Sequence, residues 1–299
     1  MNKDLSVVIV SYNTSSLISS CVKKLVYSFK SSNLSFEIII VDNASTDGSV
    51  KKIKGIRKKL TNLIIIENKK NLGYAKANNQ ALKKAKGKYI LFLNSDILID
   101  NIDWNKLLSF FSTKKEVGAL TVRVNLKDGT IDQASHRGFP TLWRSFCYFS
   151  FLERFFSFNS FFKKIFGGYH LLHLDINKIH EVEVISGAFF LTKKELMKKT
   201  GGFDDSFFMY GEDIDLCLRI KKLNYKIIYY PYFKVTHLKY QSGLKSKNEK
   251  VNIKTNFYFF QAMKIFYQKH YQKKYPFFIN FLVYLLLNWK IKSYEKNWY

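Results

Sequence analysis

Proline is nearly absent from this sequence, with 3 residues in 299, so collagen-like and proline-rich linker architectures are excluded. Cysteine is equally scarce: Cys21, Cys147 and Cys217 stand far apart, without a C-x-x-C pair. A scattered, odd set of cysteines argues against a disulfide or zinc framework. The cysteines therefore predict a protein of a reducing compartment.

Long hydrophobic runs are also missing. The apolar run at 5–10 is too short for the core of a signal peptide. The longest run, 277–287, is interrupted by Asn280 and falls short of the ~20 residues that a spanning helix needs. We therefore expect a cytoplasmic protein that is peripheral on the inner face of the cell membrane.

Arginine is scarce as well, so lysine supplies most of the formal net charge of +26, from 49 basic against 23 acidic residues. An A/T-rich genome raises lysine without any binding partner, but it raises glutamate too, and glutamate is not enriched. The excess of lysine therefore indicates an anionic partner, either a membrane surface or a nucleic acid.

A chain of 299 residues can form one large α/β domain of roughly 200–250 residues with an appendage. The first hundred residues alternate between short apolar runs and helical segments. Because the runs are unbroken rather than alternating, both faces of each strand are buried, which is typical of a parallel sheet. The predicted strands are 5–10, 37–41, 63–66 and 89–93, and the predicted helices are 17–29, 50–60 and 73–85.

Polar side chains follow each predicted strand: Ser11, Tyr12 and Asn13; Asp42 and Asn43; Glu67 and Asn68; and Asn94, Ser95 and Asp96. Open α/β sheets bind ligands outside the carboxyl ends of their strands, so these clusters should converge on one site. No G-x-G-x-x-G or P-loop motif follows the first strand, which disfavours a dinucleotide site. A phosphorylated ligand would instead be held through a cation bound by side-chain oxygens.

The segment 139–166 is rich in aromatic residues, which fits either the core of a helical subdomain or an acceptor or membrane face. Residues 182–191 are predicted to form a strand in which Gly187 permits a close approach to the backbone. A helix at 212–223 and a strand at 225–230 follow. After Leu238, twelve lysines stand against two glutamates, a net +10.

The chain resembles the inverting nucleotide-sugar glycosyltransferases of family 2, especially their rhamnosyltransferase-like branch. The resemblance covers about residues 6–242 and rests on linked motifs: V-V-I-V-S-Y-N, V-D-N-A-S-T-D-G-S, N-L-G-Y-A-K-A-N-N, L-F-L-N-S-D, S-G-A-F-F-L and F-F-M-Y-G-E-D-I-D-L-C-L-R. It implies an α/β GT-A fold with a mostly parallel central sheet. The expected organisation is a catalytic domain at 1–240, with an aromatic insert at 139–181, and a basic, aromatic helical tail at 241–299.

The resemblance also implies the site residues. Asp42 would accept from the ring N–H of a uracil or thymine, although a loop-capping role is the alternative. The metal ligands would be Asp96 and His237, holding Mn²⁺ or Mg²⁺; Asn94 stands where many relatives have Asp, which weakens the site. The run after His237 departs from the family's, which leaves any role of Ser242 open. The donor-binding residues would be Ser11, Tyr12, Asp42, Asn71, Gly73, Asn78, Asn94, Ser95 and Gly187.

The carboxylates Glu212 and Asp213 are the predicted catalytic pair. By the resemblance Asp213 is the general base that deprotonates the acceptor hydroxyl, and Glu212 orients it. Acidic residues also suit the first turn of a helix through its dipole, and that explanation suffices for Asp215.

The resemblance implies transfer of a deoxyhexose such as rhamnose from a dTDP- or UDP-linked donor. The acceptor would be a lipid-linked glycan in bacterial cell-surface polysaccharide or O-antigen synthesis. A nucleic-acid-binding protein is the alternative, disfavoured because arginine is scarce and no recognition motif is found. A catalytically inactive transferase is a third possibility. Aromatic residues flanked by lysines in the tail predict contact with an anionic membrane surface, or packing on the catalytic domain.

Overall fold

The computed structural model describes residues 3–239 and 249–296. Its centre is a nine-stranded sheet with the order β3-β2-β1-β4-β10-β6-β11-β5, and β8 pairs with β11. The first half is parallel, as expected: β1 (Lys3–Ser11), β2 (Phe36–Asp42), β3 (Leu63–Glu67) and β4 (Gly87–Asn94). Ser11 lies opposite Asp42 and Val10 opposite Asn94, so these strands end together at one edge.

The second half of the sheet is mixed. β10 (Phe189–Lys193) is antiparallel to both β4 and β6 (Val117–Leu126). β11 (Lys226–His237) runs parallel to β6, while β5 (Ile97–Asn101) and β8 (His180–Val182) are antiparallel to β11. The first four strands are all parallel to one another, and the predicted α/β fold class is confirmed.

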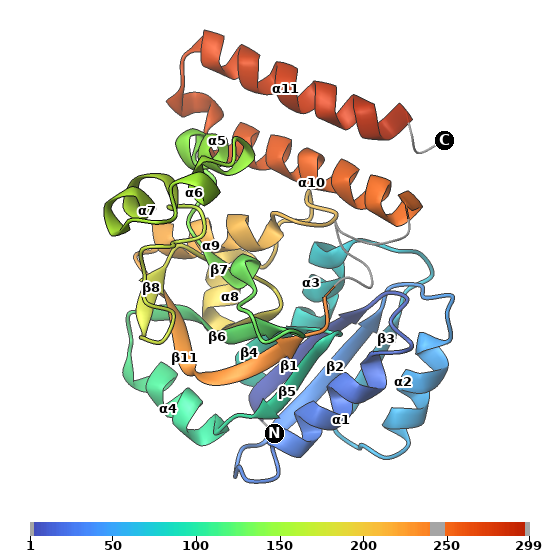
Figure 1. Cartoon of the computed structure of the whole chain (residues 1–299). Helices are drawn as coiled ribbons and strands as arrows, with labels where there is room; N and C mark the ends of the chain where they lie inside the picture. The colour runs from blue at the N-terminus through green and yellow to red at the C-terminus, as the bar shows by residue number, and fades with distance from the viewer. Residues whose placement is uncertain (1–2, 240–248, 297–299) are drawn as a thin grey trace.

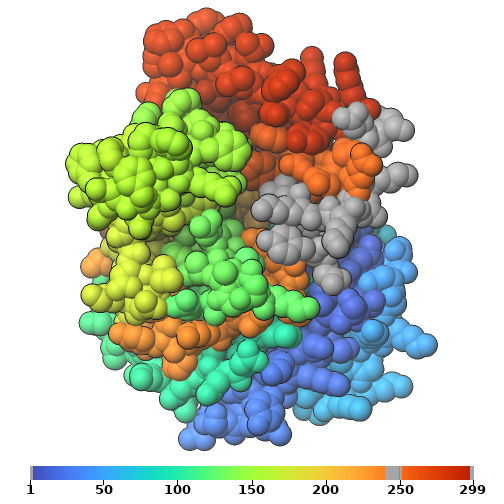
Figure 2. Space-filling model, in the orientation of Figure 1, coloured from blue at the N-terminus to red at the C-terminus, as the bar shows by residue number. Residues whose placement is uncertain are grey.

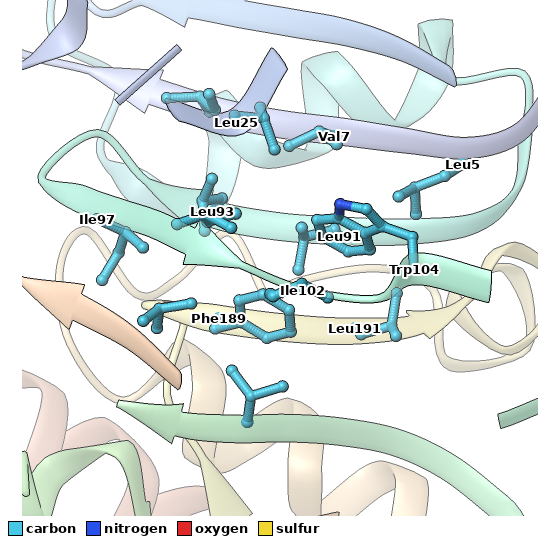
Figure 3. Close-up of a cluster of buried hydrophobic side chains, with 14 of the residues drawn as sticks. Leu5, Val7, Leu25, Leu91, Leu93, Ile97, Ile102, Trp104, Phe189 and Leu191 are labelled. Carbon is cyan, nitrogen blue, oxygen red and sulfur yellow. The ribbon is translucent and has the colours of Figure 1, made fainter. Parts of the chain in front are cut away.

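Helices cover both faces of the sheet (Figure 1). They are α1 (Ile18–Ser28), α2 (Ser49–Arg57), α3 (Tyr74–Lys84), α4 (Trp104–Thr113), α8 (Lys194–Thr200) and α9 (Glu212–Lys222). One hydrophobic core lies between the sheet and α1 and α4, where Trp104 packs with Leu91 and Phe189 and donates to the Ser28 hydroxyl (Figure 3). A second core lies on the α3 and α9 face.

The sequence prediction was wrong at the strand 182–191. That segment is divided into β8, β9 (Val184–Ile185) and β10. β9 leaves the main sheet to pair with β7 (His136–Arg137), and the Ser186 amide donates to the Ser135 carbonyl. The strand at 225–230 is longer than predicted: β11 continues past Pro231 to His237, with a register shift that accommodates the irregularity.

The aromatic insert forms three short helices, α5 (Leu142–Phe149), α6 (Leu152–Phe155) and α7 (Ser160–Phe166). They lie together at one end of the molecule, beside the C-terminal hairpin (Figure 1). Many of their aromatic rings are exposed, including Trp143, Phe151, Phe155 and Phe158. The insert is therefore not simply the core of a subdomain.

The tail forms a helical hairpin of α10 (Glu249–His270), the 3-10 turn η2 (Gln272–Lys274) and α11 (Phe277–Lys296). α10 packs on α9 and the segment before it: Tyr258 stacks on Phe208, and the His270 Nε2 lies 2.7 Å from an Asp215 oxygen. No helix of the described part is long and apolar enough to cross a membrane. Residues 241–248, with Ser242, and 297–299 of the predicted tail lie outside the described residues.

Candidate active site

A cavity of about 1820 Å³ opens at the carboxyl ends of β1 and β4 and extends to the C-terminal hairpin. It brings together most of the residues that the sequence singled out. Those lining it are Tyr12, Asn71, Gly73, Asn94, Ser95, Asp96, Gly187, Glu212, Asp213 and His237.

Three predicted donor-binding residues do not line this cavity. The Ser11 side chain is fully buried and shares a hydrogen bond of 2.9 Å with the Thr14 hydroxyl. The Asn78 amide donates to the Tyr74 carbonyl within its own helix. Asp42 is buried, with Oδ1 accepting from the Ser45 amide, while its Oδ2 has no hydrogen-bond partner among the described residues. A buried carboxylate oxygen without a partner is costly, so Asp42 retains the capacity to accept one N–H.

The loop before α3 is held by asparagine side chains. The Asn43 amide donates to Asn71 Oδ1, and its oxygen accepts from Asn68 and from the Leu72 amide. Gly73 has φ +84°, and a Cβ there would lie 2.5 Å from the Phe208 carbonyl oxygen. Only glycine therefore allows this loop to contact the segment that leads into α9. The sequence did not single out Asn43 or Asn68 as site residues beyond their place after a strand.

Gly187 and Asn94 are joined through Tyr74. The Tyr74 hydroxyl lies 3.2 Å from both the Asn94 Oδ1 and the Gly187 carbonyl oxygen. A Cβ at position 187 would lie 2.5 Å from that hydroxyl, so the predicted close approach to this backbone is made by Tyr74. The Asn94 oxygen is thus engaged by a phenol, and burial raises the pKa of Tyr74 so that it stays a donor.

Asp96 and His237 lie side by side, with 3.2 Å between Oδ1 and Nε2. The other ring nitrogen of His237 lies 2.8 Å from Asp132 Oδ2, and Lys239 Nζ binds the second Asp132 oxygen at 2.8 Å. Burial disfavours the imidazolium, but the bonds to Asp132 and Asp96 raise the pKa of His237 to about 9. Burial alone would raise the pKa of Asp132; the His237 and Lys239 partners hold it well below its usual range.

This pair fits a divalent cation. A carboxylate oxygen and an imidazole nitrogen converge, and Asp132 holds the opposite ring nitrogen as carboxylates do in carboxylate–histidine–metal sites. Within residues 3–239 and 249–296, no group of three or more His, Cys, Asp or Glu side chains forms a metal site. The remaining ligands would therefore come from a diphosphate and water. Asp132 was missed because its sequence context carries no metal-site spacing.

Glu212 and Asp213 begin α9, both buried. Asp213 Oδ2 forms an ion pair of 3.0 Å with Arg137 Nη2, and Arg137 Nη1 donates to the Tyr169 hydroxyl. Glu212 Oε2 has no described partner, and burial, reinforced by the Asp213 charge, raises the pKa of Glu212 well above its usual range. The two neighbouring carboxyls therefore differ: one is ion-paired, and the other favours its protonated form. Arg137 was not predicted.

Two family models match the chain: glycosyl transferase family 2 over residues 6–215, and glycosyl transferase family group 2 over residues 145–287. The chain belongs to glycosyl transferase family 2. The predicted family and the predicted class of enzyme, a glycosyltransferase, are thereby confirmed.

Curated relatives are similar over parts of their length. The chain is 24% identical to the rhamnosyltransferase WbbL of Escherichia coli, covering 67% of this chain and 75% of that one. It is 26% identical to the N-acetylglucosaminyl-diphospho-decaprenol L-rhamnosyltransferase of Mycobacterium tuberculosis, covering 69% and 67%. It is 41% identical to the poly(ribitol-phosphate) beta-glucosyltransferase of Bacillus spizizenii, but over 38% of this chain and only 17% of that one.

Solved structures confirm the GT-A fold. The mannosyltransferase PcManGT of Pyrobaculum calidifontis, in complex with GDP-Man and Mn²⁺, superimposes with a TM-score of 0.61 at 17% identity, covering 99% of this chain and 74% of that one. TarS of S. aureus, residues 1–349, gives 0.53 at 17% identity, covering 89% and 72%.

Proposed function

We propose that this glycosyltransferase moves a hexosyl group, with inversion, from a nucleotide diphosphate to a lipid-linked glycan in bacterial cell-surface polysaccharide or O-antigen synthesis. The observation that carries the proposal is that Asp213, ion-paired with Arg137, lines the same cavity as the Asp96–His237 pair. A proton acceptor and a candidate diphosphate-anchoring pair thus share one space.

In the proposed reaction, the acceptor hydroxyl loses its proton to Asp213 while its oxygen attacks the anomeric carbon. The bond from that carbon to the diphosphate oxygen breaks on the opposite face, which inverts the configuration. Arg137 holds Asp213 in place through one nitrogen and is itself held by Tyr169. Glu212 favours its protonated form, whereas Asp213 is ion-paired with Arg137.

Asp96 and His237 are the residues that would hold Mn²⁺ or Mg²⁺, with Asp132 and Lys239 fixing the His237 ring. When bound, such a cation neutralises charge on the departing diphosphate. A solved neighbour contains Mn²⁺, which supports a divalent ion without distinguishing Mn²⁺ from Mg²⁺.

The donor is proposed to be dTDP- or UDP-linked, with a deoxyhexose such as rhamnose. The acceptor proposed for the imide N–H of a pyrimidine is Asp42 Oδ2, which is buried and has no partner among the described residues. Two relatives are rhamnosyltransferases, and the name of one specifies a diphospho-decaprenol acceptor. These relatives support both the sugar and the lipid-linked acceptor.

The experiment is transfer by the purified full chain, using dTDP-rhamnose and UDP-hexoses with a polyprenyl-diphosphate-linked N-acetylglucosamine. We expect a dTDP- or UDP-dependent product whose anomeric configuration is inverted, measured by NMR. If neither transfer nor donor hydrolysis is detected with any of these donors, the alternative of a catalytically inactive transferase is favoured. A gel shift on random RNA at physiological salt should show no binding; a stable shift there would instead favour the nucleic-acid alternative.

A further inference from the structure

The cavity continues well beyond the catalytic pair. The lining there comes from α5 of the insert, with Phe146 and Phe149, and from the hairpin α10–α11, with Phe260, Val283, Leu286 and Trp289. We call this part the aromatic passage. Its two walls meet at Phe149 and Phe260, whose rings are stacked with centroids 6.5 Å apart. The insert and the hairpin lie together at the same end of the molecule (Figure 2).

The chemistry of the aromatic passage differs from that of the donor end. Around Asp96 the wall consists of amides, carboxylates and hydroxyls, whereas the aromatic passage is walled mainly by aromatic and aliphatic side chains. A diphosphate gains nothing from such a wall, whereas an extended apolar chain would bury its surface against it. The cavity of about 1820 Å³ also exceeds the ~300–1000 Å³ of ordinary small-molecule sites, so it has room for a second ligand beside a nucleotide sugar.

Several side chains that line the aromatic passage are exposed to solvent. Phe146 is 57% exposed, and Leu286 and Trp289 are each 61% exposed. Large apolar side chains clustered at the mouth of a cavity mark a surface that an apolar partner covers. Lys290 also lines the cavity, with its ammonium 4.8 Å from the ring of Trp289, so a cation stands beside this apolar wall.

We propose that the aromatic passage binds the lipid chain of the acceptor, placing the acceptor hydroxyl at Asp213 while the chain leads out between α5 and α11. This inference rests on the proposed function. The occupant is a chain tethered to the acceptor because the passage is continuous with the catalytic pair, so what fills it must also present a hydroxyl to Asp213. A linear hydrocarbon suits a passage that is walled by rings and open at its far end.

The first experiment compares two detergent-dispersed acceptors with the same sugar diphosphate head, one on a long polyprenyl chain and one on a methyl group. The variants are Phe146→Ser and Leu286→Ser. Both side chains are more than half exposed, so these substitutions should change the free energy of unfolding little. We expect the ratio of kcat/KM, long chain over short, to fall about tenfold in each variant. Tyr27→Ser, at an equally exposed aromatic on α1, should leave the ratio unchanged. A wild-type ratio near one, or equal losses with both acceptors, would overturn the proposal.

The second experiment does not depend on transfer. Farnesyl diphosphate carrying a dansyl group is titrated against the full chain, and binding is followed by energy transfer from Trp289, with Trp289→Phe as the spectroscopic control. We expect saturable binding that Phe146→Ser weakens about tenfold and that Asp213→Asn leaves intact. If the dansyl probe binds but the chain shows no transfer activity, only the proposed function is contradicted. If the chain transfers the sugar but the probe does not bind, only this inference is contradicted. If sedimentation shows a dimer that Leu286→Ser dissociates, the passage is a subunit interface instead.

Discussion

Arg137 and Asp213 form an ion pair of 3.0 Å that joins β7 to the first turn of α9. Both side chains are nearly buried, so the carboxylate oxygen is fixed in direction as well as in charge. The second Asp213 oxygen accepts from the Ile214 amide. The proposed base is therefore held from two sides, which is the condition for directed proton transfer.

Replacing Asp213 by Asn preserves the shape of the side chain and removes the proton acceptor. We expect kcat to fall at least about 100-fold, because general-base help contributes ~10²–10⁴-fold. Donor affinity, measured by titration with the nucleotide sugar, should change little because Asp213 acts on the acceptor. Near-normal turnover would show that the base lies elsewhere, with Glu212 next to test.

Glu212→Gln tests the protonation assigned to that residue. Burial and the Asp213 charge raise the folded-state pKa of Glu212 above its ordinary value of 4.5, so the folded chain binds a proton that the unfolded chain releases. The free energy of unfolding of the wild type should therefore fall as the pH rises from 4.5 through the raised pKa. The Glu212→Gln variant, which has no carboxyl to ionise there, should not show that fall. Tm of the variant minus Tm of the wild type should grow between pH 5 and pH 8.5. A difference that stays constant with pH would contradict the assignment.

The donor half of the site was predictable because its residues follow strands. Each of β1, β2 and β4 is a continuous apolar run, and parallel neighbours end at the same edge, so Tyr12, Asn94 and Asp96 had to converge. The alternation of strands and helices likewise predicted seven of the eight elements that begin in the first hundred residues to within a few positions, and missed β5.

Asp132 and Arg137 could not be predicted in this way. They stand on the segment after β6, whose path is fixed when His136 pairs with Ile185 and Asp132 meets His237. Those partners are distant in the chain, and no periodic pattern records the pairing. The same pairing broke the predicted strand 182–191, since β9 is diverted to β7.

Removal of the cation tests the Asp96–His237 pair. We expect EDTA to abolish transfer and Mn²⁺ or Mg²⁺ to restore it, because the diphosphate's charge needs a counter-ion as it departs. Asp132→Asn keeps a hydrogen-bond acceptor for His237 but removes the charge, and it should weaken metal affinity about 10–100-fold in a metal titration. Asp100→Asn, at an exposed carboxylate of β5 that does not line the cavity, is the matched control and should leave metal affinity unchanged. Full activity in chelator would refute the metal role.

One face of α11 carries exposed aromatic rings. Phe277, Phe278 and Phe281 are exposed by 82%, 62% and 57%, and none of them lines the cavity. Lys273 and Lys274 lie a few residues before them, in η2. Rings flanked by ammonium groups suit the headgroup layer of an anionic bilayer, where each lysine contributes ~1 kcal/mol. We therefore expect the full chain to pellet with anionic liposomes and to be released by high salt.

Truncating the tail near Lys247 would be expected to abolish this binding, but it would also remove α10, which His270 joins to Asp215 beside the catalytic pair. The sharper change is the triple substitution of Phe277, Phe278 and Phe281 by Ser, which leaves the contacts of α10 in place. We expect it to lower the pelleted fraction several-fold, while Tyr27→Ser on α1, another exposed aromatic, pellets like the wild type. If the triple variant binds liposomes as well as the wild type, α11 does not meet the bilayer. The exposed rings of 139–166 then become the candidate membrane face.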